Sequence, residues 1–388
     1  MSNVFGFISE DTFVEKMDTL IATMMGLVGA SGGTVKPTSY SNIQSLVRAG
    51  LGSKIFAVSD QIAVSRGEKT LLFDVLGNNV DEPADPQFKY SLTVGIHDCW
   101  DAAQFSASQA FYYCAEVLPA GSYYFTLLAG YDTAYGGGKT FCFTLTKEVP
   151  AGGQLTFPWA WNTQAVTTKV SSYASSTSTT AIETVPVTEG ATGTNLGVLD
   201  GKTENVNHTH RVRYGSNNYK ESAIRQLVNS DKAAGSVWVP QTKFDRPPAW
   251  NTSLAGFLNG MDPEFLSVVG KTKKVVPRNT VTDGGGFDTV EDKFFLLSRR
   301  ELFMGNEVSS INDGEPYPYF KDYSVSTSPN TGNDPNRVKY LNGSPKWYWT
   351  RTPGVGGGGG VRLGGPEGQL GYNSAGSTYG VVVACNIY

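Results

Sequence analysis

The first fifty residues carry a helical spacing of hydrophobic positions. Between residues 9 and 29, apolar side chains recur at steps of three and four, from Phe13 to Val28. This pattern predicts an amphipathic helix, followed by a shorter helix at 40–50 that Gly50 closes. Such an apolar face packs on its own chain, on copies of itself or on a neighbouring subunit. We therefore interpret residues 1–54 as an N-terminal helical segment for assembly or anchoring.

From Phe56 onward the hydrophobic period changes to two, which is typical of strands. Apolar runs such as FAVSDQIAV, TLLFDVLG and KTFCFTLTKEV are separated by clusters of Asn, Gly, Pro and Asp. Short strands with turn signals between them predict an antiparallel β-domain, a sandwich or a small barrel, over residues 55–162. Within it, ASQAFYYCAEVL at 107–118 is expected to form a helix or a helical turn.

The chain is rich in Ser and Thr at the start of residues 163–204 and shows no large apolar period there. We interpret this stretch as a linker or domain boundary, with a solvent-facing strand as the alternative. Beyond it, helical spacing at 221–231 and 262–270 is followed by short apolar strands and long irregular loops. Residues 205–388 are therefore expected to form an α+β domain, and the whole chain a multi-domain α+β protein.

Composition and charge exclude several classes of protein. Charged residues make up 17% of the 388 residues and the formal net charge is −4, without a basic stripe, so no nucleic-acid partner is expected. No apolar run approaches the roughly 18 residues that span a bilayer, so no membrane partner is expected. The N-terminus lacks the basic and apolar regions of a signal peptide. If the protein works outside a cell, we expect assembly in the host cytoplasm and release by lysis.

Signatures of catalysis are sparse. YGGGKT at 135–140 is similar to a phosphate-binding loop, but Thr133 stands where that motif needs a glycine, and a β-turn is the favoured interpretation. With three histidines, no GxSxG and no cysteine in a local nucleophile signature, we expect neither an enzyme nor a cofactor. The four cysteines are expected to be buried free thiols, with a Cys114–Cys142 disulfide as the alternative.

Two stretches offer metal-ligand chemistry. His208 and His210 alternate on a strand-like run, so both imidazoles would share one face near Glu204. Asp283 and Asp288 flank a glycine-rich loop that could hold calcium together with backbone carbonyls. Neither stretch supplies a complete ligand set. Hydrogen bonds at a domain junction and an ordinary glycine turn are therefore the favoured interpretations, and no metal is expected.

Four segments of the C-terminal half form a combined pattern. They are ESAIRQLVNSD (221–231), DKFFLLSRREL (292–302), GNDPNRVKYLNG with KWYWTRTPG (332–354) and GVVVAC (380–385). Together they resemble the C-type-lectin-fold domain, of the formylglycine-generating-enzyme-like subtype, that is found in variable proteins of diversity-generating retroelements. The matching residues are Ile224, Arg225, Asn229, Ser230, Phe295, Leu296, Leu297, Ser298, Trp349, Arg351, Thr352, Pro353, Gly380, Val381 and Ala384. Thr350, Val382 and Val383 depart from the pattern.

The resemblance implies a binding function. In such proteins a reverse transcriptase mutates a copied template, and the substitutions collect on an exposed surface of an invariant scaffold. Here the diversified region would be 346–388 of a phage virion or tail-fibre protein, displayed on the virion surface or otherwise extracellular. It would bind a host surface protein or glycan and form a homo-oligomer, with a trimer as one arrangement. The expected binding face consists of Val355, Gly356, Gly357, Gly358, Gly359, Gly360, Leu363, Glu367, Gln369, Leu370, Tyr372, Asn373, Ser374 and Tyr379.

The five consecutive glycines, Gly356–Gly360, are expected to leave that face nearly bare. Because the flanking strands hold the fold, polar substitutions there should leave the melting temperature nearly unchanged. Three alternatives stay open: a bacterial surface adhesin, a virion component without receptor binding, and an enzyme of the formylglycine-generating type. The enzyme needs cysteines placed for copper and thiol chemistry, and Cys385 alone lies in the domain, which argues against it.

Overall fold

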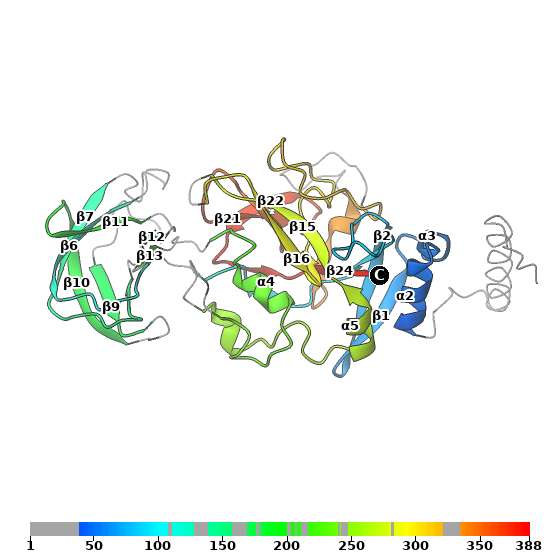
Figure 1. Cartoon of the computed structure of the whole chain (residues 1–388), viewed down its shortest axis with the longest axis horizontal. Helices are drawn as coiled ribbons and strands as arrows, with labels where there is room; N and C mark the ends of the chain where they lie inside the picture. Colours follow the sequence, from blue (N-terminus) through cyan, green and yellow to red (C-terminus); the bar gives the residue numbers. More distant parts are fainter. Residues whose placement is uncertain are drawn as a thin grey trace, which may run out of the picture.

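The computed structural model describes residues 39–388 apart from 108–110, 128–138, 157–168, 176–177, 179, 200–202, 206–207, 211–215, 240, 242–246, 281–282 and 321–333. The predicted amphipathic helix at 9–29 lies outside the described residues. In the described part, Figure 1 shows one group of strands at the left and a larger group of strands and helices in the centre. The coarse prediction is confirmed, because the chain forms several β-sheets with few helices.

A central sheet of six strands lies in the described part of the chain. Its path runs through β1 (Gln61–Arg66), β2 (Lys69–Asn78), β3 (Leu92–Ile96), β24 (Val383–Ile387) and β14 (Val269–Gly270), and β17 (Phe294–Leu296) also pairs with β24. β24 pairs antiparallel with β3, with Cys385 opposite Val94. Every residue of β3 and β24 is buried, as expected for strands in the middle of a sheet covered on both faces.

The C-terminal sheet packs in the same core. Its spatial order is β22 (Leu370–Ser374), β21 (Gly360–Gly364), β20 (Tyr348–Pro353), β23 (Thr378–Gly380) and β4 (Ala102–Gln104). Two hairpins complete this part of the chain: β15 (Thr272–Pro277) with β16 (Phe287–Asp292), and β18 (Lys339–Leu341) with β19 (Ser344–Lys346). One cluster of buried residues joins the two sheets, from Ile43 near the start of the described chain to Ile387 near its end.

A third sheet, which we call the inserted sheet, has nine strands within the described residues. Its order is β11 (Thr194–Leu199), β6 (Gly121–Leu127), β7 (Thr140–Leu145), β10 (Ala181–Glu189), β9 (Lys169–Tyr173), β8 (Gln154–Thr156), β5 (Phe111–Cys114), β13 (His208–His210) and β12 (Thr203–Asn205). It has its own hydrophobic cluster, which includes Phe125, Leu155 and Val170. In Figure 1 these strands form the group on the left.

The described helices are short. They are α2 (Tyr40–Arg48), α3 (Gly52–Ile55), α4 (Ala223–Val228), α5 (Pro263–Val268) and the 3-10 turns η2 (Ala249–Thr252) and η3 (Pro335–Arg337). Side chains of Ser39, Ser222 and Asp262 accept backbone amides at the starts of α2, α4 and α5, as N-caps do. The predicted helices at 40–50, 221–231 and 262–270 are thus confirmed. None of the helices in the described residues combines the length and apolarity needed to cross a bilayer.

The expected domain boundaries need correction. Residues 55–162 do not form one β-domain, because β1–β4 join the central and C-terminal sheets whereas β5–β8 join the inserted sheet. Residues 40–54 likewise belong to the main core, where Ile43 and Val47 are buried, and not to a separate assembly segment. The cause is long-range pairing, β24 with β3 and β23 with β4, which a local hydrophobic period does not encode. The described residues of 39–107 and 216–388 therefore form one discontinuous core.

Two local predictions are also wrong. The stretch 163–204 is not a linker, because β9, β10 and β11 are strands of the inserted sheet, in line with the alternative of a solvent-facing strand. Residues 107–118 contain no helix in their described part. Instead, β5 pairs with β8 and β13 and buries Tyr112 and Cys114. The three consecutive aromatic residues, Phe111–Tyr113, favour a strand once partner strands are present on both sides.

Candidate functional site

The strand β20 anchors the predicted diversified region, 346–388, in the core. All six of its residues are buried. Trp349 donates its indole N–H to the carbonyl of Ala103 at 2.7 Å and packs edge-on against Phe105 and Tyr379. Tyr348 donates its hydroxyl to the carbonyl of Arg337 at 2.9 Å. These contacts tie the strand to β4 and to the 3-10 turn η3, so β20 serves as a rigid support.

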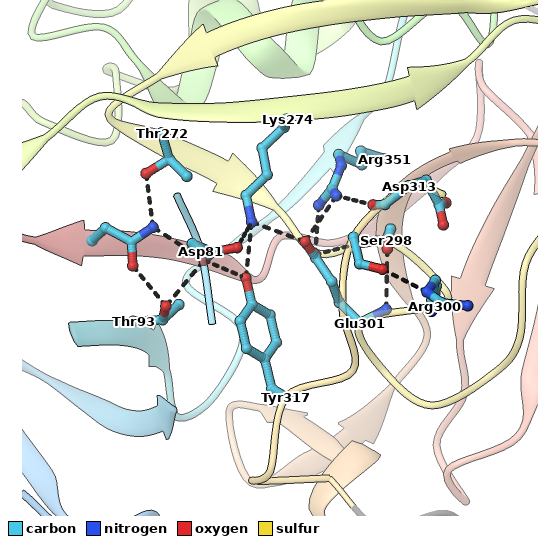
Figure 2. A network of polar contacts seen from close by, with 12 residues as sticks. Asp81, Thr93, Thr272, Lys274, Ser298, Arg300, Glu301, Asp313, Tyr317 and Arg351 are labelled. Carbon is cyan, nitrogen blue, oxygen red and sulfur yellow. Dashed lines mark hydrogen bonds and ion pairs between the residues drawn. The ribbon is translucent and has the colours of Figure 1, made fainter. Parts of the chain in front are cut away.

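Arg351, also on β20, lies in a fully buried polar network, which Figure 2 shows. Its guanidinium donates to both carboxylate oxygens of Glu301, at 2.5 and 2.8 Å, and to the carbonyls of Leu296 and Asp313. Burial by itself would lower the pKa of Arg351, but Glu301 raises it overall. The arginine therefore stays charged and holds three separate segments of the chain together.

The glycine loop, residues 354–360, is held by one buried asparagine. Nδ2 of Asn217 lies 3.2, 2.7 and 2.8 Å from the carbonyl oxygens of Gly354, Gly357 and Gly360, and its backbone N–H donates to Gly358. Asn279 in turn donates to Oδ1 of Asn217 at 2.8 Å. Three convergent carbonyls on one amide group make the path of this loop a specific structure and not a free tail.

The fourteen residues of the expected binding face include buried, partly exposed and exposed ones. Gly358, Gly360, Leu363, Gln369 and Leu370 are buried, so the prediction that they lie on an exposed face is wrong. Gly356, Glu367 and Tyr372 are exposed, and the partly exposed ones are Val355, Gly357, Gly359, Asn373, Ser374 and Tyr379. The strand period accounts for Leu363 on β21 and Leu370 at the start of β22, whose side chains point into the core, whereas Gly358 and Gln369 lie outside these strands.

At several glycines of this region an aromatic ring occupies the space that a side chain would need. A Cβ added at Gly364 would lie 2.2 Å from Cζ of Tyr348, and one at Gly371 would lie 2.1 Å from Cζ3 of Trp347. A Cβ at Gly360 would lie 2.0 Å from Cζ of Tyr372. At Gly356, by contrast, no described atom lies within 4 Å of that position. The expectation that polar residues can replace several of Gly356–Gly360 holds sterically at Gly356, whereas a side chain at Gly360 would have to displace the half-exposed ring of Tyr372.

One cluster on this face reaches solvent through Tyr372, and we call it the Tyr372 patch: Val355, Glu307, Arg362 and Tyr372. The guanidinium of Arg362 lies 5.0 Å from the centroid of the Tyr372 ring, whose residue is 51% exposed. Glu307 accepts hydrogen bonds from Arg362 at 2.7 Å, and its carboxylate lies 3.4 Å from the backbone nitrogen of Val355. Sequence reasoning had found Val355 and Tyr372 but not Arg362 or Glu307.

Glu307 pre-orients the arginine of this patch. Its side chain is 5% exposed and also pairs with Arg299 at 2.5 Å. Burial would raise the pKa of Glu307, but the hydrogen bonds and charges of Arg362 and Arg299 lower it overall. An ionised carboxylate held between two guanidinium groups leaves Arg362 with one fixed orientation. No local motif marks Glu307, because it reaches the patch from a loop 55 residues before Arg362.

The alternative sites receive little support. Asp283 accepts Nδ2–H groups of Asn218 and Asn279 at 3.0 Å, and Asp288 pairs with Lys220, so protein donors engage both carboxylates of the calcium-loop alternative. Among the described residues no group of three or more His, Cys, Asp or Glu side chains is arranged to hold a metal. The strands β12 and β13 carry Glu204, His208 and His210, whose side chains lie outside the described atoms.

The structure also describes part of the YGGGKT stretch and all four cysteines. Lys139 pairs with Glu189 on the surface, and Thr140 begins β7, while residues 135–138 lie outside the described part. All four cysteines are free, so the Cys114–Cys142 disulfide is not formed. Burial raises the pKa of the Cys99 thiol to about 12 and that of Cys385 well above its usual range, which makes both thiols unreactive at neutral pH.

The sequence model of a family described as Domain of unknown function (DUF6273) matches residues 193–388. The chain belongs to the DUF6273 family. Neither the curated proteins nor the solved structures include a match to it. The DUF6273 region contains β20–β23, the polar network around Arg351 and the whole Tyr372 patch. It does not contain β1–β4, although β3 and β4 pair with its strands β24 and β23. The DUF6273 region of this chain therefore completes its sheets with strands from outside the matched residues.

Proposed function

We propose that this DUF6273 protein is a ligand-binding display protein whose C-terminal sheet presents a diversifiable face to a host surface protein or glycan. The domain is proposed to be a C-type-lectin fold of the variable-protein type, on a phage virion and in a homo-oligomer. One observation carries the proposal: residues 346–388 separate into a buried support, β20 and β24, and a face on which Tyr372 is exposed beside the partly exposed Arg362.

The chemistry of the patch suits recognition. A half-exposed tyrosine next to an arginine offers an apolar face, a hydroxyl and guanidinium donors at low entropic cost. Tyr and Arg are also enriched among the residues that dominate binding energy at interfaces. Because Glu307 fixes the arginine from beneath, part of the ordering cost of binding is already met in the free protein. These features favour a binding surface over a surface loop without function.

The burial pattern also agrees with diversification by mutation. A surface that changes without loss of folding needs side chains that touch little of the core, carried on strands that do not move. Gly356, Glu367, Tyr372 and the exposed Thr378 meet this requirement. Leu363, Gln369 and Leu370 do not, and we therefore leave them out of the proposed face.

Comparison of sibling genomes tests the diversification. We expect substitutions at the exposed positions 356, 367, 372 and 378, constancy at Gly364, Trp349 and Arg351, and a reverse-transcriptase gene with a near-identical template repeat beside this gene. Substitutions spread evenly over buried and exposed positions, with no such gene nearby, would contradict the proposal.

Binding itself is tested with the full-length protein on an array of bacterial surface glycans and on intact bacterial cells. The variants Tyr372→Ala and Arg362→Ala should lose affinity by roughly tenfold or more for whichever probe the wild type binds. Lys139→Ala, on the surface of the inserted sheet, serves as the control and should bind as the wild type does. Equal binding by all three variants would show that the patch is not the site.

A further inference from the structure

Three ionisable side chains from distant parts of the chain meet inside the discontinuous core. Lys274 on β15 contacts Asp81, which follows β2, and its Nζ lies 2.9 Å from Oε1 of Glu301. The exposed fractions of these side chains are 3%, 7% and 0%. Figure 2 shows Lys274 reaching from its strand with its ammonium group between the two carboxylates. Neither the proposed binding function nor the family assigns a role to this triad.

The surroundings of the lysine are aromatic. Its Nζ lies 4.1 Å from the centroid of the Phe295 ring and 5.5 Å from that of Tyr317. A buried pair of opposite charges loses much of the hydration that stabilises it in water. Burial would raise the pKa of Asp81, but Lys274, Tyr317 and Asn386 lower it overall, so the reactive form is a minor one. In that form one proton has moved from Nζ to Asp81 along their contact, which leaves a neutral amine and a neutral carboxylic acid. Those are the forms in which an amine is nucleophilic and a carboxyl carbon is electrophilic.

The second oxygen of Asp81 lies among donors. Oδ2 accepts the hydroxyl of Tyr317 at 2.7 Å and Nδ2–H of Asn386 at 3.0 Å. Oδ1 is the oxygen in contact with Lys274. Thr93 also donates its hydroxyl to Oδ2, at 3.0 Å. Attack on Cγ would place negative charge on one carboxyl oxygen, and these donors at Oδ2 would stabilise that charge. The two carboxyl oxygens of Asp81 therefore have different roles. Oδ2 stays bonded to Cγ, whereas Oδ1 faces the attacking amine and is the one that leaves.

Glu301 is suited to carry protons but not to be attacked. Arg351 donates to both of its oxygens, and Ser298 donates its backbone N–H to Oε2 at 2.8 Å. These donors hold both carboxylate oxygens of Glu301 in place, so neither is positioned to leave as water. Its Oε1 nevertheless lies within hydrogen-bond distance of Nζ, where a base must be to accept a proton from the amine.

We propose that Lys274 and Asp81 condense to an intramolecular isopeptide bond, with Glu301 as the proton carrier. The amine Nζ attacks Cγ of protonated Asp81, Glu301 takes a proton from the nitrogen and returns it to the leaving Oδ1 hydroxyl, and the tetrahedral centre collapses. The Nζ–Cγ bond forms, the Cγ–Oδ1 bond breaks and one water molecule leaves. The ammonium and carboxylate become one neutral amide, so charge is balanced and no oxidant or other reactant is needed.

The bond would join two residues that are 193 positions apart in the sequence, one before the inserted sheet and one after it. The chain from β5 to β13 lies between Asp81 and Lys274, so the cross-link closes a loop that contains the whole inserted sheet. A covalent bond there keeps the two parts of the discontinuous core together even if that sheet is pulled or unfolds. As with disulfides, a closed long loop also reduces the freedom of the unfolded chain. The inference does not depend on the proposed binding function.

The mass of the full-length wild-type protein, denatured and without any other treatment, tests the proposal. We expect the mass calculated from the sequence less one water molecule. After trypsin digestion we expect a branched peptide in which 70–89 is joined to 274–278, since trypsin does not cut after an acylated lysine. An intact mass without the loss of water, or a branch that joins Lys274 to the peptide of Glu301, would overturn the assignment.

Variants then test the roles of the residues. Lys274→Met should have the mass calculated from its own sequence, without loss of water. Lys273→Met, at the exposed neighbouring position of β15, should still be one water molecule lighter than calculated. Glu301→Gln should leave freshly purified protein at the full mass, and Tyr317→Phe should slow the loss of water over time. If the Lys274 or Glu301 variants fail to fold, the wild-type mass and branched peptide still decide the question. A loss of water that persists in Lys274→Met would refute the proposal.

Discussion

The strands β20 and β22 belong to the same sheet, separated by β21, and yet they are opposite in character. Every residue of β20 is buried, and its arginine is tied to the core, whereas β22 has one buried residue and presents Tyr372 to solvent. Both strands contain tyrosine and polar residues, so composition does not distinguish them. The difference teaches that a strand becomes support or binding face according to what packs against it. Glu301 lies against Arg351 on β20, which is the support, whereas solvent covers Tyr372 on β22, which belongs to the proposed binding face.

The largest effect is expected from Arg351→Met in β20. Removing one partner of a buried ion pair leaves the Glu301 carboxylate poorly compensated, so unfolding free energy should fall by about 3–5 kcal/mol. Denaturation by urea measures this, with Arg362→Met as the control, since that side chain is 27% exposed and should cost far less. Similar losses in both variants would break the contrast between the two strands.

Next in size is Glu307→Gln, which loosens the support of the Tyr372 patch. Weakening hydrogen bonds to charged partners should cost about 1.5–3 kcal/mol at neutral pH. The folded-state pKa of Glu307 is lowered, so its contribution is present above the unfolded pKa of about 4.3 and is lost as pH falls through the folded value. The difference between wild type and variant should therefore shrink below pH about 4. A difference that stays constant with pH would rule out the ionised carboxylate as its source.

A matched pair of glycine substitutions tests the packing within the sheet. Gly364→Ala should destabilise the protein by about 1–3 kcal/mol, because the new Cβ overlaps the fully buried ring of Tyr348. Gly356→Ala should change stability by less than about 0.5 kcal/mol, because its position is open. Thermal unfolding of the two variants gives the comparison. Equal melting temperatures would mean that β21 shifts to accommodate the methyl group.

The smallest stability effect is expected from Tyr372→Ala in β22. The ring is half exposed, and its contact with Arg362 is of the kind that contributes about 0.5–1 kcal/mol. Loss of binding without loss of melting temperature would sharpen the comparison, because it separates recognition from folding. A drop in stability as large as that of Arg351→Met would instead assign Tyr372 to the support.

Local pattern was sufficient for many elements. Helices at α4 and α5 were predicted from their apolar spacing, and the strands β2, β7, β17 and β20 from their apolar runs. The domain boundaries were not predicted, because strands such as β3 and β4 look the same whether they pair with a neighbour or with β24 and β23 near the end of the chain. Nor was Phe111–Cys114 recognised as a strand, since its partners β8 and β13 lie far along the sequence.

The candidate site was predicted only in outline. Residues 346–388 were identified as its location, and Tyr372 and Gly356 were rightly placed at the surface. Arg362 and Glu307 were missed, because the first belongs to a strand with mostly buried neighbours and the second comes from a separate loop. The buried triad of Asp81, Lys274 and Glu301 left no local signal either, since its members come from three distant segments.

The sequence by itself determined the helices α2, α4 and α5, many of the strands, and that glycine-rich residues near the end lie between apolar strands. Those features depend on neighbouring residues and follow from side-chain period and capping. Only the tertiary structure decided what the glycines are for. Gly360, Gly364 and Gly371 leave room for rings of Tyr372, Tyr348 and Trp347, while Gly356 meets no described atom. The physical reason is that a glycine's role depends on which side chain from elsewhere occupies the space of its missing Cβ, and that space is defined by long-range packing.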